Sequence, residues 1–151
     1  MREEELNKAR RTASIVSAAV TGAVFFYALI VEAAVRHPGL TPPLTGAAAA
    51  AARYGLYFWG AASVLAVRFV RPLIEARGKA LGPAGTMAAQ SAAAAALCEV
   101  PALAGLMIFF LTGGYWDFYL LAVFSTVMEI YHFPRSRDWA ERAVNRRGPL
   151  T

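Results

Sequence analysis

The sequence predicts an all-α integral membrane protein whose four helices form a bundle with both termini in the cytoplasm. Hydrophobic residues make up 58% of the 151 residues, and the mean hydropathy is +0.44. Soluble domains contain only about 45–50% apolar residues, even with glycine counted. Four apolar runs are long enough to cross a hydrocarbon core about 30 Å thick. A chain of this length is expected to form a single membrane domain, residues 1–151.

Each predicted helix ends where proline or glycine interrupts an apolar run. The proline- and glycine-rich segment 36–45 and the basic segment 71–83 are typical of loops, and Gly113-Gly114 indicates a tight turn. After Pro134 the chain becomes polar, so residues 134–151 are expected to form a short basic cytoplasmic tail. The predicted membrane helices cover about residues 12–35, 46–70, 84–112 and 118–133.

The distribution of positive charge predicts how the helices are oriented. Of the 15 Lys and Arg residues, 13 lie before residue 12, between residues 68 and 79, or in the tail. The positive-inside rule places these three segments in the cytoplasm, with Arg36 on the opposite side. The expected location is therefore the inner (cytoplasmic) membrane, with several spans and with the N-terminus and the C-terminus inside.

Composition and motifs exclude several classes of function. The net charge of +5 is spread over the ends of apolar runs, so it forms no basic stripe of the kind that binds nucleic acid. The single cysteine, Cys98, allows no intrachain disulfide. The sequence contains no HExxH or CxxC metal spacing, no phosphate-binding glycine loop and no G-x-S-x-G elbow. We therefore expect no metal, no cofactor, no nucleic-acid partner and no enzymatic activity.

Glu99 is the leading candidate for a functional residue, because it lies inside the third apolar run. A carboxylate there costs roughly 2.5–3.5 kcal/mol on membrane-insertion scales, so it must be protonated, paired or exposed to a polar cavity. Pro101 cannot donate a backbone hydrogen bond to the carbonyl of Leu97, which frees an oxygen beside the carboxylate for a proton or cation. Gln90 can extend a polar path towards the cytoplasm only if the helix kinks, because residues nine apart do not share a helix face.

The residues around Glu99 resemble part of a known family. The run 97–108 (LCEVPALAGLMI) is similar to the carboxylate helix of rotary ATP synthase c subunits, or proteolipids. In that family a small-residue run leads to Glu or Asp, and Gly-Leu follows six residues later, as Gly105-Leu106 follows Glu99. The resemblance is local, because the second predicted helix carries Arg53 and aromatic residues instead of the family's glycine repeat. It implies an ion-binding role for Glu99.

Two further pairs of polar residues lie in or near the predicted helices. If the first two helices form a hairpin, Glu32 and Arg53 lie at the same depth and are predicted to form an ion pair, with snorkelling of Arg53 to the outer surface as the alternative. Glu129 and His132 are three residues apart, so they share a helix face near the cytoplasm. They are candidates for the place where protons enter the protein, and the alternative is an ordinary interfacial pair.

Two functions are therefore consistent with the sequence. In the first, the protein binds or conducts protons or cations through Glu99. In the second, it is a structural or accessory membrane subunit in which Glu99 makes an interhelical hydrogen bond. Small-residue runs at 47–52 and 92–96 favour close helix packing within the chain or between chains. The expected partners are membrane lipids, further copies of the chain or other membrane proteins.

Overall fold

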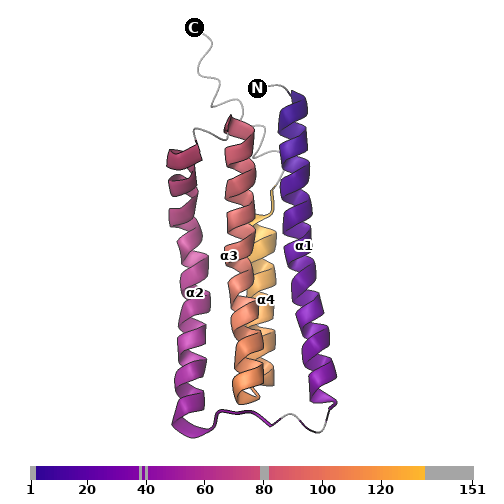
Figure 1. Cartoon of the computed structure of the whole chain (residues 1–151), viewed down its shortest axis with the longest axis vertical. Helices are drawn as coiled ribbons and strands as arrows, with labels where there is room; N and C mark the ends of the chain where they lie inside the picture. The colour runs from indigo at the N-terminus through magenta and orange to yellow at the C-terminus, as the bar shows by residue number, and fades with distance from the viewer. Residues whose placement is uncertain (1–2, 38, 40, 79–81, 135–151) are drawn as a thin grey trace.

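The protein is a bundle of four long antiparallel helices in the computed structural model, which describes residues 3–37, 39, 41–78 and 82–134 (Figure 1). The predicted all-α, four-helix architecture is confirmed, and the described residues contain no strand. We call the end of the bundle with the connections 36–45 and 113–114 the loop end, and the opposite end the terminal end. The helices are α1 (Glu3–Val35), α2 (Gly46–Arg77), α3 (Gly82–Thr112) and α4 (Tyr115–His132).

Two helices extend further towards the terminal end than predicted. α1 begins at Glu3 rather than residue 12, because residues 3–11 are mostly good helix formers even though they are polar. α2 continues through Pro72 to Arg77, so the predicted loop 71–83 is largely helical. A proline inside a helix removes one backbone hydrogen bond. Next to it, the Gln90 side chain of α3 donates a hydrogen bond of 2.9 Å to the Arg71 carbonyl and supports the segment.

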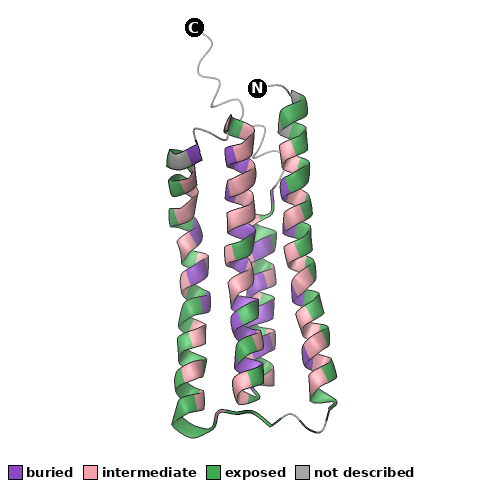
Figure 2. Ribbon diagram, in the orientation of Figure 1, coloured by how far each residue is buried: buried purple, intermediate pink, exposed green. Residues whose placement is uncertain are grey.

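Three of the helices in the described part of the chain are long and apolar enough to cross a membrane. The qualifying stretches are Asn7–Val35, Gly46–Ala76 and Gly82–Thr112. Large apolar side chains point away from the bundle on these helices, as the exposed faces in Figure 2 indicate, and Phe25 and Phe58 are 65% and 77% exposed. Such outward apolar faces are typical of helices surrounded by lipid. α4 is shorter, and it contains Asp117 and Glu129.

α3 is the central helix and contacts the other three. Small residues let the backbones approach: a Cβ atom placed on Gly60 of α2 would lie 3.3 Å from Pro101 Cα, and one on Gly105 would lie 3.0 Å from Phe118 Cα of α4. Close packing of this kind is what holds helices together in lipid. α1 and α2 consequently lie on opposite sides of α3 (Figure 1). This arrangement determines which polar side chains meet.

Candidate functional site

Two acidic side chains from neighbouring helices lie at the same depth in the bundle. Glu99 is 13 residues before the end of α3 at Thr112, and Glu129 is 14 residues after the start of α4 at Tyr115. At 1.5 Å per residue, both lie about 20 Å from the loop end. Thr21 of α1, 14 residues before Val35, lies at this depth as well. Three helices thus bring polar side chains to one level, which we call the carboxyl cluster: Thr21, Tyr27, Glu99, Ser125 and Glu129.

Glu99 is half-buried and accepts a hydrogen bond from α1. The Tyr27 hydroxyl donates to Glu99 Oε1 over 2.6 Å. A distance of about 2.5–2.7 Å is typical of a hydroxyl that donates to an ionised carboxylate. The long tyrosine side chain leans towards the N-terminus of its helix, and this allows it to reach from its own level to that of Glu99. Tyr27 therefore stabilises a negative charge on Glu99.

Glu129 has different surroundings, although it lies at the same level. Its side chain is only 4% exposed. Ser125 Oγ lies 3.4 Å from Glu129 Oε1, and the Thr21 hydroxyl lies beside the same carboxyl group. Among the buried polar side-chain atoms that the structure describes, Glu129 Oε2 is the one without a hydrogen-bond partner. A buried carboxyl oxygen without a donor is the atom of the pair on which a proton is least unfavourable.

The hydroxyl protons beside Glu129 are already used elsewhere. Ser125 Oγ donates to the Cys98 carbonyl over 2.7 Å, and Thr21 Oγ1 donates to the Ser17 carbonyl over 3.0 Å. A hydroxyl has one proton to donate and two lone pairs that accept, and an ionised carboxylate can only accept. The Ser125 hydroxyl also donates to Glu129 Oε1 over 3.4 Å, but its single proton lies closer to the Cys98 carbonyl, so Glu129 receives weaker donation than Glu99. A protonated Glu129 carboxyl group can in turn donate to the lone pairs of these hydroxyls.

The two carboxyl groups also interact electrostatically with each other. A second negative charge at the same level is unfavourable in a low-dielectric site. The hydroxyl donors also differ, because Tyr27 donates to Glu99 over 2.6 Å whereas Ser125 donates to Glu129 only over 3.4 Å. Such a pair can hold one proton on Glu129 and one negative charge on Glu99.

The other residues predicted around Glu99 face elsewhere. Pro101 is fully buried against Gly60 of α2, and Leu97 packs with Val67 of α2 in an apolar cluster. Gln90 donates to α2 through the Arg71 carbonyl, so it does not extend a polar path from Glu99. The reason is the helix period, since nine residues place two side chains on opposite faces. Whether the Leu97 carbonyl takes part in ion binding stays a prediction.

Glu129 and His132 use different partners. His132 Nδ1 lies 2.9 Å from the Met128 carbonyl and 3.7 Å from Cys98 Sγ. Because a carbonyl only accepts, Nδ1 is the donor in the contact with Met128. Cys98 itself is fully buried. The role of Glu129 and His132 in proton entry stays a prediction, with Glu129 now placed in the carboxyl cluster.

The predicted ion pair between Glu32 and Arg53 is wrong. Arg53 Nε donates to Asp117 Oδ2 of α4 over 3.0 Å, a second guanidinium nitrogen contacts the same oxygen, and Tyr57 donates to Oδ1 over 2.8 Å. Glu32 instead accepts hydrogen bonds from two tyrosines of α4. α1 and α2 lie on opposite sides of α3, so the assumed hairpin does not bring these residues together (Figure 1).

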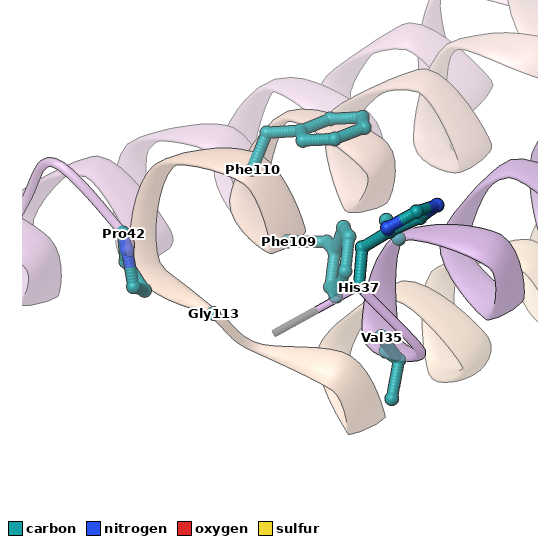
Figure 3. Close-up of a pocket in the computed structure, with 7 residues that line it drawn as sticks. Val35, His37, Pro42, Phe109, Phe110 and Gly113 are labelled. Atoms are coloured by element: carbon teal, nitrogen blue, oxygen red, sulfur yellow. The ribbon is translucent and has the colours of Figure 1, made fainter. Parts of the chain in front are cut away.

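A separate pocket of about 180 Å³ lies at the loop end between α1 and α3. His37, Phe109, Phe110 and Pro42 line it, as Figure 3 shows. His37 is exposed and lies far along the bundle from His132, so the two histidines do not share a site. In the part of the chain that the structure describes, no group of three or more His, Cys, Asp or Glu side chains is arranged to hold a metal ion.

Sequence reasoning missed Tyr27, Thr21 and Ser125. A signal for Glu129 was present: Glu99 and Glu129 are nearly equidistant from the Gly113-Gly114 turn, and a helical hairpin brings such residues to one level. No comparable signal identifies the hydroxyl residues, because each also contacts a group on another helix: Tyr27 donates to Glu99, Ser125 donates to the Cys98 carbonyl, and Thr21 lies beside Glu129. Comparison with known proteins finds no matching family model, and no curated protein or solved structure that is similar to this chain.

Proposed function

We propose that this protein binds a proton within the inner membrane at the carboxyl cluster, with Glu129 as the protonated group and Glu99 as its ionised partner. The observation that carries the proposal is the contrast between the hydroxyl donors: Tyr27 donates to Glu99 over 2.6 Å, whereas Ser125 donates mainly to the Cys98 carbonyl over 2.7 Å and lies 3.4 Å from Glu129 Oε1. This arrangement favours one proton and one charge on the pair. The proton occupancy of such a site can follow the pH on one side of the membrane, if the site takes up and releases its proton there.

The proposed topology has all four helices crossing the bilayer and both termini in the cytoplasm. α4 has 18 residues, about 27 Å of helix, which is close to the thickness of the hydrocarbon core. The free-energy cost of placing its two acidic residues in the bilayer is lower than their hydropathy indicates. Asp117 is paired with Arg53, and Glu129 is neutral in our proposal. The loop end is then outside, and the carboxyl cluster lies nearer the cytoplasmic surface.

The oxygens that surround Glu129 also suit a small monovalent cation. Serine and threonine lone pairs and a carboxylate are hard oxygen ligands, as such ions prefer. Proton binding is favoured because each hydroxyl accepts from a protonated carboxyl group in a simple one-to-one bond. A site for a proton and a site for a small cation respond differently to added Na⁺, so the labelling experiment below includes Na⁺.

Two measurements on the purified full-length protein test the proposal. Dicyclohexylcarbodiimide reacts with protonated carboxyl groups in apolar surroundings, so we expect labelling of the wild type and its loss in Glu129→Gln. Glu99→Gln and the exposed N-terminal variant Glu4→Gln should still be labelled. Suppression of labelling by Na⁺ at constant pH would favour a cation. Labelling that persists in Glu129→Gln would contradict the assignment of the proton.

The second measurement asks whether the bound proton moves. In proteoliposomes with a pH-sensitive dye inside, an imposed potential should drive proton flux through the wild type. Glu99→Gln and Glu129→Gln should each abolish that flux, while Glu4→Gln should leave it intact. Equal flux in all four proteins would exclude transport through the cluster.

A structural subunit is the second candidate function, and the Tyr27–Glu99 hydrogen bond favours it because this bond joins α1 to α3. In that case Tyr27→Phe and Glu99→Leu weaken the bundle or its assembly, and the protein binds no exchangeable proton. A structural bond does not need the unpartnered oxygen of Glu129. That oxygen is the feature that makes proton binding the better proposal.

A further inference from the structure

An apolar groove of about 350 Å³ lies between α1 and α4, apart from the carboxyl cluster. Val24 and Ala28 of α1 face Ala122 and Val123 of α4 across it. The groove opens to the outside of the bundle, since Val123 is 62% exposed at its mouth. α1 and α4 contact each other much less than either contacts α3. The groove is therefore a gap in the bundle that faces the surrounding lipid.

Polar contacts close both ends of the groove. At the loop end, Tyr119 and Tyr115 donate to Glu32 Oε1 over 2.6 and 2.7 Å, and Glu32 lies one turn beyond Ala28 on α1. At the terminal end, Thr21 and Glu129 meet, about one turn beyond Val24 and Thr126. Between these contacts the lining is almost entirely apolar. Water has too few polar partners to stay in such a space, so the groove suits an apolar group.

A positive charge that can bind a lipid headgroup lies beyond the loop end of the groove. The Arg36 side chain is 81% exposed, and its nearest guanidinium nitrogen lies 4.0 Å from Glu32 Oε2. This distance is long for an ion pair, and the guanidinium has five donors, so donors remain for another anion. Arg36 follows Glu32 by one helical turn and lies at the outer surface of the proposed topology. Phosphate is the anion available at that level of a membrane.

We propose that the groove between α1 and α4 binds one phospholipid of the outer leaflet, with an acyl chain along the groove and its phosphate at Arg36. The lipid completes the packing between two helices that contact each other less than either contacts α3. Thr21 and Glu129 of the carboxyl cluster lie about one turn beyond the terminal end of the groove, so the bound acyl chain ends next to that cluster. The site does not depend on whether Glu129 carries a proton.

Native mass spectrometry of the full-length protein tests this site, after reconstitution in vesicles of phosphatidylglycerol and phosphatidylcholine in equal parts. We expect one retained lipid per chain, enriched in phosphatidylglycerol. Ala28→Trp fills the groove, so retention should fall roughly tenfold, a change equivalent to 1.4 kcal/mol. Ala61→Trp, on the exposed face of α2, is the matched control and should keep the lipid. If Ala28→Trp does not fold, Val123→Trp at the exposed mouth replaces it.

The headgroup contact is tested with Arg36→Gln. This variant should keep an acyl chain but lose the preference for phosphatidylglycerol, while Arg68→Gln on the exposed surface of α2 should keep it. Unchanged preference in Arg36→Gln would overturn the phosphate contact. Retention by Ala28→Trp and Val123→Trp equal to the wild type would overturn the groove site. Dimers without lipid would show that a second copy covers the groove, which also overturns the proposal.

Discussion

Ser125 Oγ of α4 lies 2.7 Å from the carbonyl oxygen of Cys98 on α3. This contact ties the two helices together, and it engages the Ser125 proton more closely than the 3.4 Å contact with Glu129 Oε1 does. Glu99 instead accepts a shorter hydrogen bond of 2.6 Å from Tyr27. Two carboxyl groups at one depth thus differ in how strongly the surrounding hydroxyls donate to them. Our account of the protein depends on this difference.

Ser125→Ala should destabilise the bundle by about 1 kcal/mol, because it removes a buried interhelical hydrogen bond. The neighbouring hydroxyl of Thr126 donates to Ala122 within its own helix, so Thr126→Ala should cost less. Unfolding of both variants in mixed micelles with increasing denaturing detergent measures the two free energies. If the two costs are equal, the Ser125 bond between helices adds nothing to stability.

Tyr27→Phe should lower the free energy of unfolding by about 1 kcal/mol, because the charged acceptor Glu99 loses its donor; hydrogen bonds in membranes average about 0.6 kcal/mol. Tyr131→Phe is the control, since Tyr131 is 74% exposed on α4. A double-mutant cycle of Tyr27→Phe with Glu99→Gln checks that the loss belongs to this pair. If the losses in unfolding free energy of the two single variants add up to that of the double variant, the result would contradict the Tyr27–Glu99 hydrogen bond.

Gly105→Ala should destabilise the protein by about 1–3 kcal/mol, the usual cost of overpacking. Its new Cβ atom would lie 3.0 Å from Phe118 Cα and 3.1 Å from Leu121 Cβ, so α4 must move away from α3. Gly55→Ala is the matched control, because no atom lies within 4 Å of the position of its Cβ. There the better helix propensity of alanine should stabilise α2 by about 0.5–1 kcal/mol. Thermal unfolding of the two variants in one detergent compares them.

Arg53→Gln and Asp117→Asn should each weaken the contact of α2 with α4. Asp117 has Arg53 and Tyr57 as its partners. The double variant should be less destabilised than the sum of the two single changes, because it leaves no unpaired charge. Neither change should alter labelling of the carboxyl cluster by dicyclohexylcarbodiimide, since this pair lies near the loop end. A loss of that labelling would show that the two polar sites are coupled.

The sequence predicts the four helices and the importance of Glu99 because hydrophobic length and an isolated charge are strong local signals. It does not predict that α1 and α2 lie on opposite sides of α3. That arrangement comes from close contacts such as Gly60 against Pro101, which depend on the shapes of two helix surfaces. The wrong prediction that Glu32 pairs with Arg53 followed from the assumption that α1 and α2 lie side by side.

The composition of the carboxyl cluster is harder to predict than its location. Glu99 and Glu129 can be matched by counting residues from the α3–α4 turn. The direction in which Ser125 and Thr21 donate depends on which carbonyls lie within reach, and this requires coordinates. The sequence therefore identifies acidic residues inside apolar helices, but it does not show which side chains of the other helices surround each of them.

The most direct test of the account is infrared spectroscopy of the reconstituted protein at neutral pH, read at the carbonyl stretch of a protonated carboxyl group. We expect one such band that shifts in D₂O, persists in Glu99→Gln and disappears in Glu129→Gln. Absence of the band from the wild type, or its loss in Glu99→Gln alone, would show that the proton is not on Glu129.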